Sequence, residues 1–176
     1  MKIKPAYEHS KFGKFMFNLC AKWTKFIIKH KWLYYLLACT WGILMTLLGL
    51  IITLVLFLFK LFCWKGVNFK TYYWIYLIKV GPDYWGGCEM GLMFLRDWKS
   101  TDSYINPHEF GHTVQNCLFG PLFPFLVAIP SAARYWLREI FPNKNWSAYD
   151  SAWFEDAATQ CGDYMVTELN KEQSET

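Results

Sequence analysis

Residues 32–59 read WLYYLLACTWGILMTLLGLIITLVLFLF, a run of 28 positions without a charged side chain. The hydrocarbon core of a bilayer, about 30 Å thick, needs roughly 20 helical residues to cross it. Trp32 and Trp64 stand near the two ends of the run, where an aromatic belt belongs. We therefore expect a transmembrane helix over residues 32–64.

The segment before this run, residues 1–31, is strongly basic, with eight lysines against one glutamate. Between Lys11 and Lys29 the lysines recur at helical spacing with aromatic and aliphatic residues between them. That pattern is typical of a basic amphipathic helix on an anionic membrane surface, and the alternative is a helix packed on the body of the protein. The charge gives no reason to expect nucleic acid, because the remainder of the chain after residue 64 is mildly acidic.

The remainder, residues 65–176, is expected to form one compact domain. The whole chain is 54% hydrophobic and 20% aromatic, which excludes a disordered protein. Runs of aromatic and β-branched residues at 72–80 and 88–98 predict two strands, and Asn106-Pro107 predicts the start of a helix. With a last helix over 147–169, the fold class is mainly α with a small β-sheet (α+β).

A second uncharged stretch, residues 113–133, is interrupted by Gly120, Pro121, Pro124 and Pro130. A straight spanning helix does not tolerate this many breaks. We expect a broken, re-entrant or interfacial segment, or the apolar core of the domain.

His108, Glu109 and His112 form the pattern H-E-x-x-H at the predicted helix start. Residues i and i+4 share a helix face, so both imidazoles can bind one zinc ion while the carboxylate lies beside it. Zinc lowers the pKa of its water, and a carboxylate can take that proton as a peptide carbonyl is attacked. The pattern therefore predicts a zinc hydrolase; its alternative is a chance match.

The zinc site needs a third ligand. The metzincin pattern requires Gly at 115 and His at 118, where this chain has Gln115 and Leu118. The two other histidines lie in the basic head, on the far side of the expected transmembrane helix. A downstream carboxylate is expected instead, and the segment SAWFEDAATQCG at residues 151–162 offers one.

With Glu155, Ala158 and Gly162 in the pattern E-x-x-A-x-x-x-G, the chain resembles the gluzincin class of zinc metallopeptidases. The segment HEFGHTVQ, followed by GPL, is also similar to small bacterial membrane proteins that carry HE(F/Y)GHT(I/V)Q. The resemblance covers residues 86–162. It implies His108, His112 and Glu155 as zinc ligands and Glu109 as general base, in a minimal gluzincin-like domain.

Two parts of the gluzincin pattern are missing: a second lobe, and the histidine that stabilises the oxyanion. Three phenols could replace that histidine, and two aspartates could support a ligand histidine; they are Tyr104, Tyr149, Tyr164, Asp156 and Asp163. Helix geometry favours Glu155 over its neighbour Asp156 as the ligand, because Glu155 shares a face with small residues that permit close approach of the two helices.

The function that we expect is a membrane-anchored zinc endopeptidase that cleaves peptides or proteins near the bilayer, in a bacterial cell membrane. The basic head favours a cytoplasmic N-terminus with the catalytic body outside. The alternatives are a zinc-binding, proteolytically inactive membrane protein with a sensing, immunity or regulatory role, a purely structural protein, and an intramembrane protease of the site-2 type.

Overall fold

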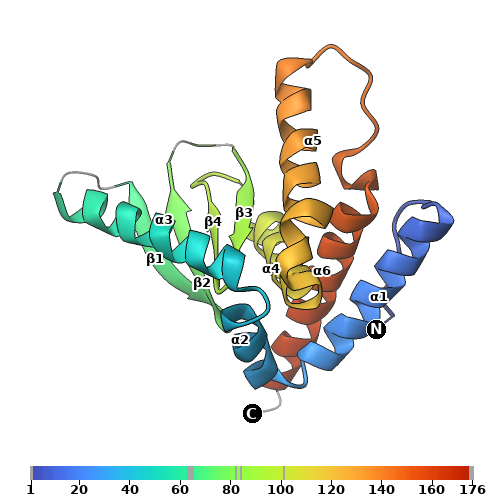
Figure 1. Ribbon diagram of the computed structural model, residues 1–176, viewed down its shortest axis with the longest axis horizontal. Helices are drawn as coiled ribbons and strands as arrows, with labels where there is room; N and C mark the ends of the chain where they lie inside the picture. The colour runs from blue at the N-terminus through green and yellow to red at the C-terminus, as the bar shows by residue number, and fades with distance from the viewer. Residues whose placement is uncertain (1, 63–65, 82, 84, 101, 175–176) are drawn as a thin grey trace.

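The computed structural model describes residues 2–62, 66–81, 83, 85–100 and 102–174. Helices predominate, and one small mixed sheet accompanies them, so the α+β prediction is confirmed. The sheet and helix α3 occupy one side of the molecule, α1 and α6 the other, with α4 between them (Figure 1). The C-terminal end of the expected transmembrane segment, which includes Trp64, lies outside the described residues.

The sheet has four strands in the order β1-β2-β4-β3, where two strands were expected. They are β1 (Val67–Tyr72), β2 (Ile75–Val80), β3 (Gly87–Met90) and β4 (Met93–Arg96), and only the β2/β4 pair is parallel. Tight turns divide the expected strands: Tyr73 has φ 53° and Gly91 has φ 71°. The sequence runs looked continuous because the turn residues are themselves aromatic or apolar.

Helices α4 (Asp102–Phe119) and α6 (Trp153–Ser174) pack against each other and carry the core. The predicted helix start at Asn106-Pro107 is wrong, because α4 already begins at Asp102 and Pro107 lies within it. The last helix also begins and ends later than expected. Phe110, Val114 and Met165 from this pair join Ile75 and Phe94 of the sheet in one buried cluster.

The expected single helix over residues 32–64 is two helices, α2 (Lys31–Cys39) and α3 (Ile43–Phe62). Tertiary contacts explain the break: Tyr34 of α2 is buried and its hydroxyl donates to the Gly91 carbonyl at 2.8 Å. Gly42 lies so close to Asn116 that an added Cβ would stand 3.0 Å from its side-chain oxygen. Within the described residues, α3 remains the one unbent helix long and apolar enough to cross a membrane.

The N-terminal helix α1 (Lys11–Ile27) begins at Ser10, whose hydroxyl accepts from the Gly13 amide at 3.2 Å. Its apolar face is not wholly available to a membrane surface, because part of it is buried in the protein. Met16, Phe17 and Cys20 are buried in one cluster with Phe154, Ala157 and Cys161 of α6. This is the alternative considered from the sequence, a helix packed on the body of the protein, and residues 1–31 therefore share the core of that body.

The interrupted segment 113–133 is broken, as expected. Helix α4 ends at Phe119, and a 3-10 turn (Gly120–Leu122) and a π-helical turn (Pro124–Ala128) lead into α5 (Ile129–Ile140). The chain direction changes by 117° between the two helical parts. Helix α5 therefore stands away from the α4/α6 pair (Figure 1).

Candidate metal centre

Helix α4 presents His108 and His112 towards Glu155 of α6, and it places Glu109 against Gly87 of β3. Two glycines allow the helices to touch: an added Cβ would stand 1.9 Å from the Ala158 carbonyl oxygen at Gly111, and 1.8 Å from the Pro107 carbonyl oxygen at Gly162. The expectation that small residues on the Glu155 helix permit close approach is confirmed. Any side chain at either glycine would separate the histidines from the carboxylate.

Three side chains converge at the contact between the helices. The Nε2 atoms of His108 and His112 are 3.1 Å apart, and Glu155 Oε2 lies 3.1 Å from the first and 3.4 Å from the second. Ligands at about 2.0 to 2.1 Å from a tetrahedral ion are about 3.3 Å from one another. A buried His, His and Glu group with this spacing could hold a metal ion.

The buried carboxylate of Glu155 faces the two imidazoles of the cluster. It is fully buried, and neither oxygen has a hydrogen-bond partner in the described part of the chain, although the two imidazoles lie close. Burial raises its pKa, but the two imidazoles outweigh burial and hold the pKa well below its usual range. Burial lowers the pKa of His112, and Glu155 raises it to about 9. A cation between these groups would satisfy all three.

The second nitrogen of each imidazole is held by a neighbour. His112 Nδ1 lies 2.8 Å from Gln115 Oε1, and Gln115 Nε2 donates to the Phe154 carbonyl at 2.7 Å. His108 Nδ1 lies 2.8 Å from Thr159 Oγ1. Since an amide oxygen only accepts, Nδ1 of His112 carries a proton, and Nε2 is the nitrogen that the neutral imidazole would offer to a metal ion. Sequence reasoning missed both supports, although Gln115 stands at i+3 from His112 on the same helix.

The two aspartates considered as supports do not contact the imidazoles. Asp156 accepts from the backbone of Ala6 at 3.0 Å and lies 2.8 Å from His9 Nε2. It therefore ties the N-terminal segment to α6. Asp163 is exposed, and its pKa is raised by partial burial. The expectation that His9 is separated from the site is wrong: it binds the residue next to Glu155.

A cleft of about 770 Å³ opens beside the cluster, between β3 and its preceding loop on one side and α5 on the other. His108, Glu109 and His112 line it, together with largely apolar side chains. Burial raises the pKa of Glu109. The Glu109 carboxylate rests on Gly87, where an added Cβ would stand 2.6 Å from Oε1.

Of the three phenols, Tyr104 and Tyr149 line this cleft and Tyr164 does not. The Tyr104 hydroxyl donates to the Asp150 carboxylate at 2.8 Å, and its ring stacks on His108 with centroids 5.7 Å apart. The Tyr149 hydroxyl lies 2.8 Å from Ser131 Oγ. Burial and then the nearby Glu155 raise the pKa of Tyr149, so it stays protonated.

The chain matches no protein-family model, no curated protein and no solved structure.

Proposed function

We propose that this protein is a membrane-associated zinc metalloendopeptidase. The observation that carries the proposal is the convergence of His108, His112 and Glu155, with Glu109 beside them, at the wall of a cleft large enough for a peptide segment. A structural metal site is closed, whereas this one adjoins open space.

The donor set favours zinc. Two imidazole nitrogens and one carboxylate oxygen are a common ligand set of catalytic zinc, with a fourth position left for water or substrate. Zinc, when bound, supplies a water of lowered pKa and polarises the substrate carbonyl.

Glu109 is the residue that we assign to proton transfer. It is buried, lines the cleft and stands next to a ligand in the chain. Burial raises its pKa, which moves its basicity towards the working pH and makes it a better acceptor. It accepts the proton of the attacking water and later donates it to the leaving amine.

The cleft wall favours an extended peptide as substrate. Strand β3 pairs only with β4 in the described sheet, and Gly87, Cys88 and Glu89 line the cleft. An extended chain can add to such an edge through main-chain hydrogen bonds. The apolar residues of α5 opposite would contact the substrate side chains.

The location that we propose is a bacterial cell membrane. Helix α3 and the resemblance to HE(F/Y)GHT(I/V)Q proteins support it. The substrates are then peptides or proteins near the bilayer.

The test combines metal analysis with hydrolysis. Detergent-purified protein should contain one zinc per chain and cleave unstructured peptides from a mixed library. Glu109→Gln should keep the zinc and lose about 10² to 10⁴ in rate. Protein that holds zinc but cleaves no peptide would favour the inactive sensing, immunity or regulatory role, and protein without zinc would exclude both functions.

A further inference from the structure

The segments before and after α3 form a single packed body. Helix α1 is buried against α6, His9 binds Asp156, and Tyr34 of α2 binds the Gly91 carbonyl. A helix that crosses a membrane once places the chain before it and the chain after it on opposite sides. These contacts are incompatible with that arrangement, and hence with an N-terminus and a catalytic body on opposite sides.

Helix α3 also lies along the sheet for most of its length. An added Cβ at Gly49 would stand 2.5 Å from the Met90 carbonyl oxygen, and the Thr53 hydroxyl lies 2.7 Å from Met93 Sδ. Further along, the Phe57 and Phe69 rings have centroids 6.3 Å apart. One face of α3 is thus covered by β3, β4 and β1 in turn.

This packing would carry the sheet into the hydrocarbon if α3 stood upright in the bilayer. In the described sheet, β1 pairs with β2 alone, so its outer edge has main-chain groups without a strand partner. Lipid-exposed sheet edges do not occur within the hydrocarbon region, because each unpaired group costs several kcal/mol. Exposed Lys70 on the same strand adds a charge.

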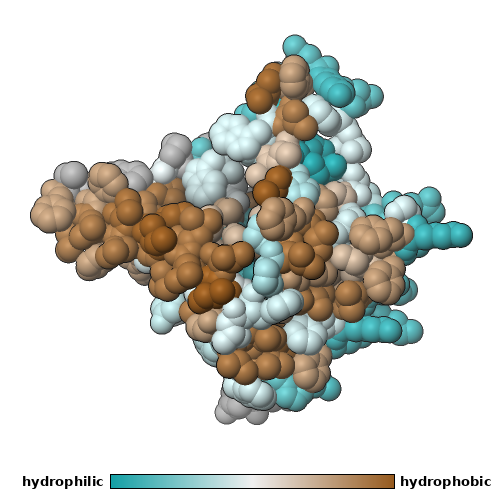
Figure 2. Space-filling view, in the orientation of Figure 1, coloured by the Kyte–Doolittle hydropathy of each residue, from teal (hydrophilic) through white to brown (hydrophobic). Residues whose placement is uncertain are grey.

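The faces of α3 turned away from the sheet are apolar and exposed. They carry leucine, isoleucine, valine and phenylalanine side chains with exposed fractions between 43% and 81%, namely Leu44, Leu47, Leu48, Leu50, Ile51, Leu54, Val55, Leu58, Phe59, Leu61 and Phe62. Figure 2 shows this surface as a continuous hydrophobic band along α3, which continues towards the centre of the molecule. A band of this size marks a contact with a membrane or a partner.

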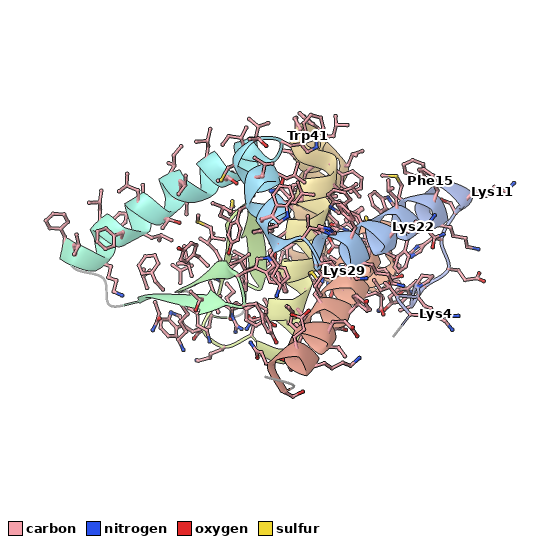
Figure 3. The ribbon with its side chains drawn as sticks, turned by 90° about the horizontal axis from the view of Figure 1, so that it is seen from below. Lys4, Lys11, Phe15, Lys22, Lys29 and Trp41 are labelled. Carbon is pink, nitrogen blue, oxygen red and sulfur yellow. The ribbon has the colours of Figure 1, made fainter. Side chains whose placement is uncertain are left out.

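Of the two kinds of contact, the positive charges near the apolar surface favour a membrane over a protein partner. Lys11, Phe15 and Lys22 stand at helical spacing on the exposed side of α1, and Phe15 is 63% exposed. In Figure 3, α3 and α1 lie at opposite ends of the molecule, but Trp41, Phe15 and Lys11 lie towards the upper edge of the view, as α3 does, and Lys4 lies towards the lower edge. Lysines beside exposed aromatic rings, on the same face of the molecule as an exposed apolar helix, match an anionic bilayer surface.

We propose that α3 lies in the plane of an anionic bilayer, with its sheet-free faces in the lipid and the lysines of α1 at the headgroups, and that it does not cross the membrane. The N-terminus, the metal site and the cleft are then all on one side of the bilayer. The substrate meets the site from water at the membrane surface. This inference rests on the membrane association in the proposed function, not on zinc or hydrolysis.

The test measures the depth of spin labels along α3 in the full chain. Leu47, Leu54 and Leu61 are all exposed and seven residues apart, so labels there share a helix face. Each is introduced as cysteine into a parent lacking Cys39, Cys63 and Cys88, and the labelled protein is bound to vesicles containing phosphatidylglycerol. Accessibility to oxygen and to a water-soluble nickel complex gives the depth, and a label at Lys144 serves as the control in water.

An in-plane helix gives three nearly equal depths. A crossing helix gives steps of about 10 Å between labels, from a rise of about 1.5 Å per residue, and that result overturns the proposal. Labels without lipid contact overturn both the proposal and the membrane association. In vesicle sedimentation, Lys11→Gln should weaken binding about fivefold and the matched Lys4→Gln should not; equal loss in both would exclude the assigned headgroup contact.

Discussion

Nδ1 of His112 lies 2.8 Å from the amide oxygen of Gln115, whose nitrogen donates to the Phe154 carbonyl at 2.7 Å. The second hydrogen bond fixes which end of the amide faces the imidazole. Gln115 therefore fixes the tautomer of His112 and connects α4 to the residue that precedes Glu155.

Replacing Gln115 should weaken metal binding without preventing it. We expect Gln115→Ala to raise the zinc dissociation constant about 10- to 100-fold, the range for a residue that orients a ligand. Competition with a chromogenic chelator measures the constant. Gln160→Ala is the control, since Gln160 makes neither hydrogen bond to the imidazoles; equal effects of the two variants would refute the assigned role of Gln115.

Glu155 and Asp156 are neighbours with different tasks, and single substitutions should separate them. Glu155→Ala removes one of the three side chains that we assign to the metal, so it should abolish stoichiometric zinc and leave the N-terminal segment bound. Asp156→Ala should instead free residues 6–9, because it loses the hydrogen bonds to Ala6 and His9. Zinc content and limited proteolysis of the N-terminus are the measurements. Loss of zinc in Asp156→Ala with retention in Glu155→Ala would reverse the assignment.

The sequence predicted the centre of the site better than its surroundings. The spacing of His108 and His112 reflects local helix geometry, which a sequence pattern reveals directly. The small residues near Glu155 likewise indicated that a second helix could pack closely against the first. The contact between His9 and Asp156 joins residues 147 apart, and no local pattern encodes it. The break between α2 and α3 was missed for the same reason, because hydropathy does not register the buried hydrogen bond of Tyr34.

Glu89 should make stability depend on pH. Burial raises the pKa of this carboxyl from about 4.5 to about 8, although the Gly91 amide donates to it at 2.6 Å. Between these values the folded chain binds more protons than the unfolded chain, so the Glu89 contribution destabilises the fold as pH rises through that window. Glu89→Gln removes the titration. The melting temperature of Glu89→Gln minus that of the wild type should increase from pH 5 to pH 8. A difference in melting temperature that does not change with pH would contradict this prediction.

Tyr149 is the phenol that we expect to stabilise the oxyanion. Its raised pKa keeps the hydroxyl protonated, so it can donate to negative charge that develops in the cleft. We expect Tyr149→Phe to lower kcat about 10²- to 10³-fold with a smaller change in KM. Tyr164→Phe, outside the cleft, is the matched control. A change confined to KM would assign Tyr149 to substrate binding instead.

Gly87 and Gly86, adjacent at the start of β3, should respond in opposite ways to the same added methyl group. At Gly87 a Cβ would stand 2.6 Å from Glu109 Oε1, 2.7 Å from its Cγ and 2.9 Å from its Cδ, so the whole Glu109 side chain must shift. The backbone there is not left-handed, so Gly87→Ala should fold, retain zinc and lose most of its hydrolysis because the general base is displaced.

At Gly86, φ is 92° and no other atom lies within 4 Å of the added Cβ. Gly86→Ala should therefore cost about 1 to 2 kcal/mol of stability through backbone strain and keep most of its hydrolysis. Thermal melting, zinc content and peptide turnover of the two variants form the test, and full activity in Gly87→Ala would remove Glu109 from the role of general base.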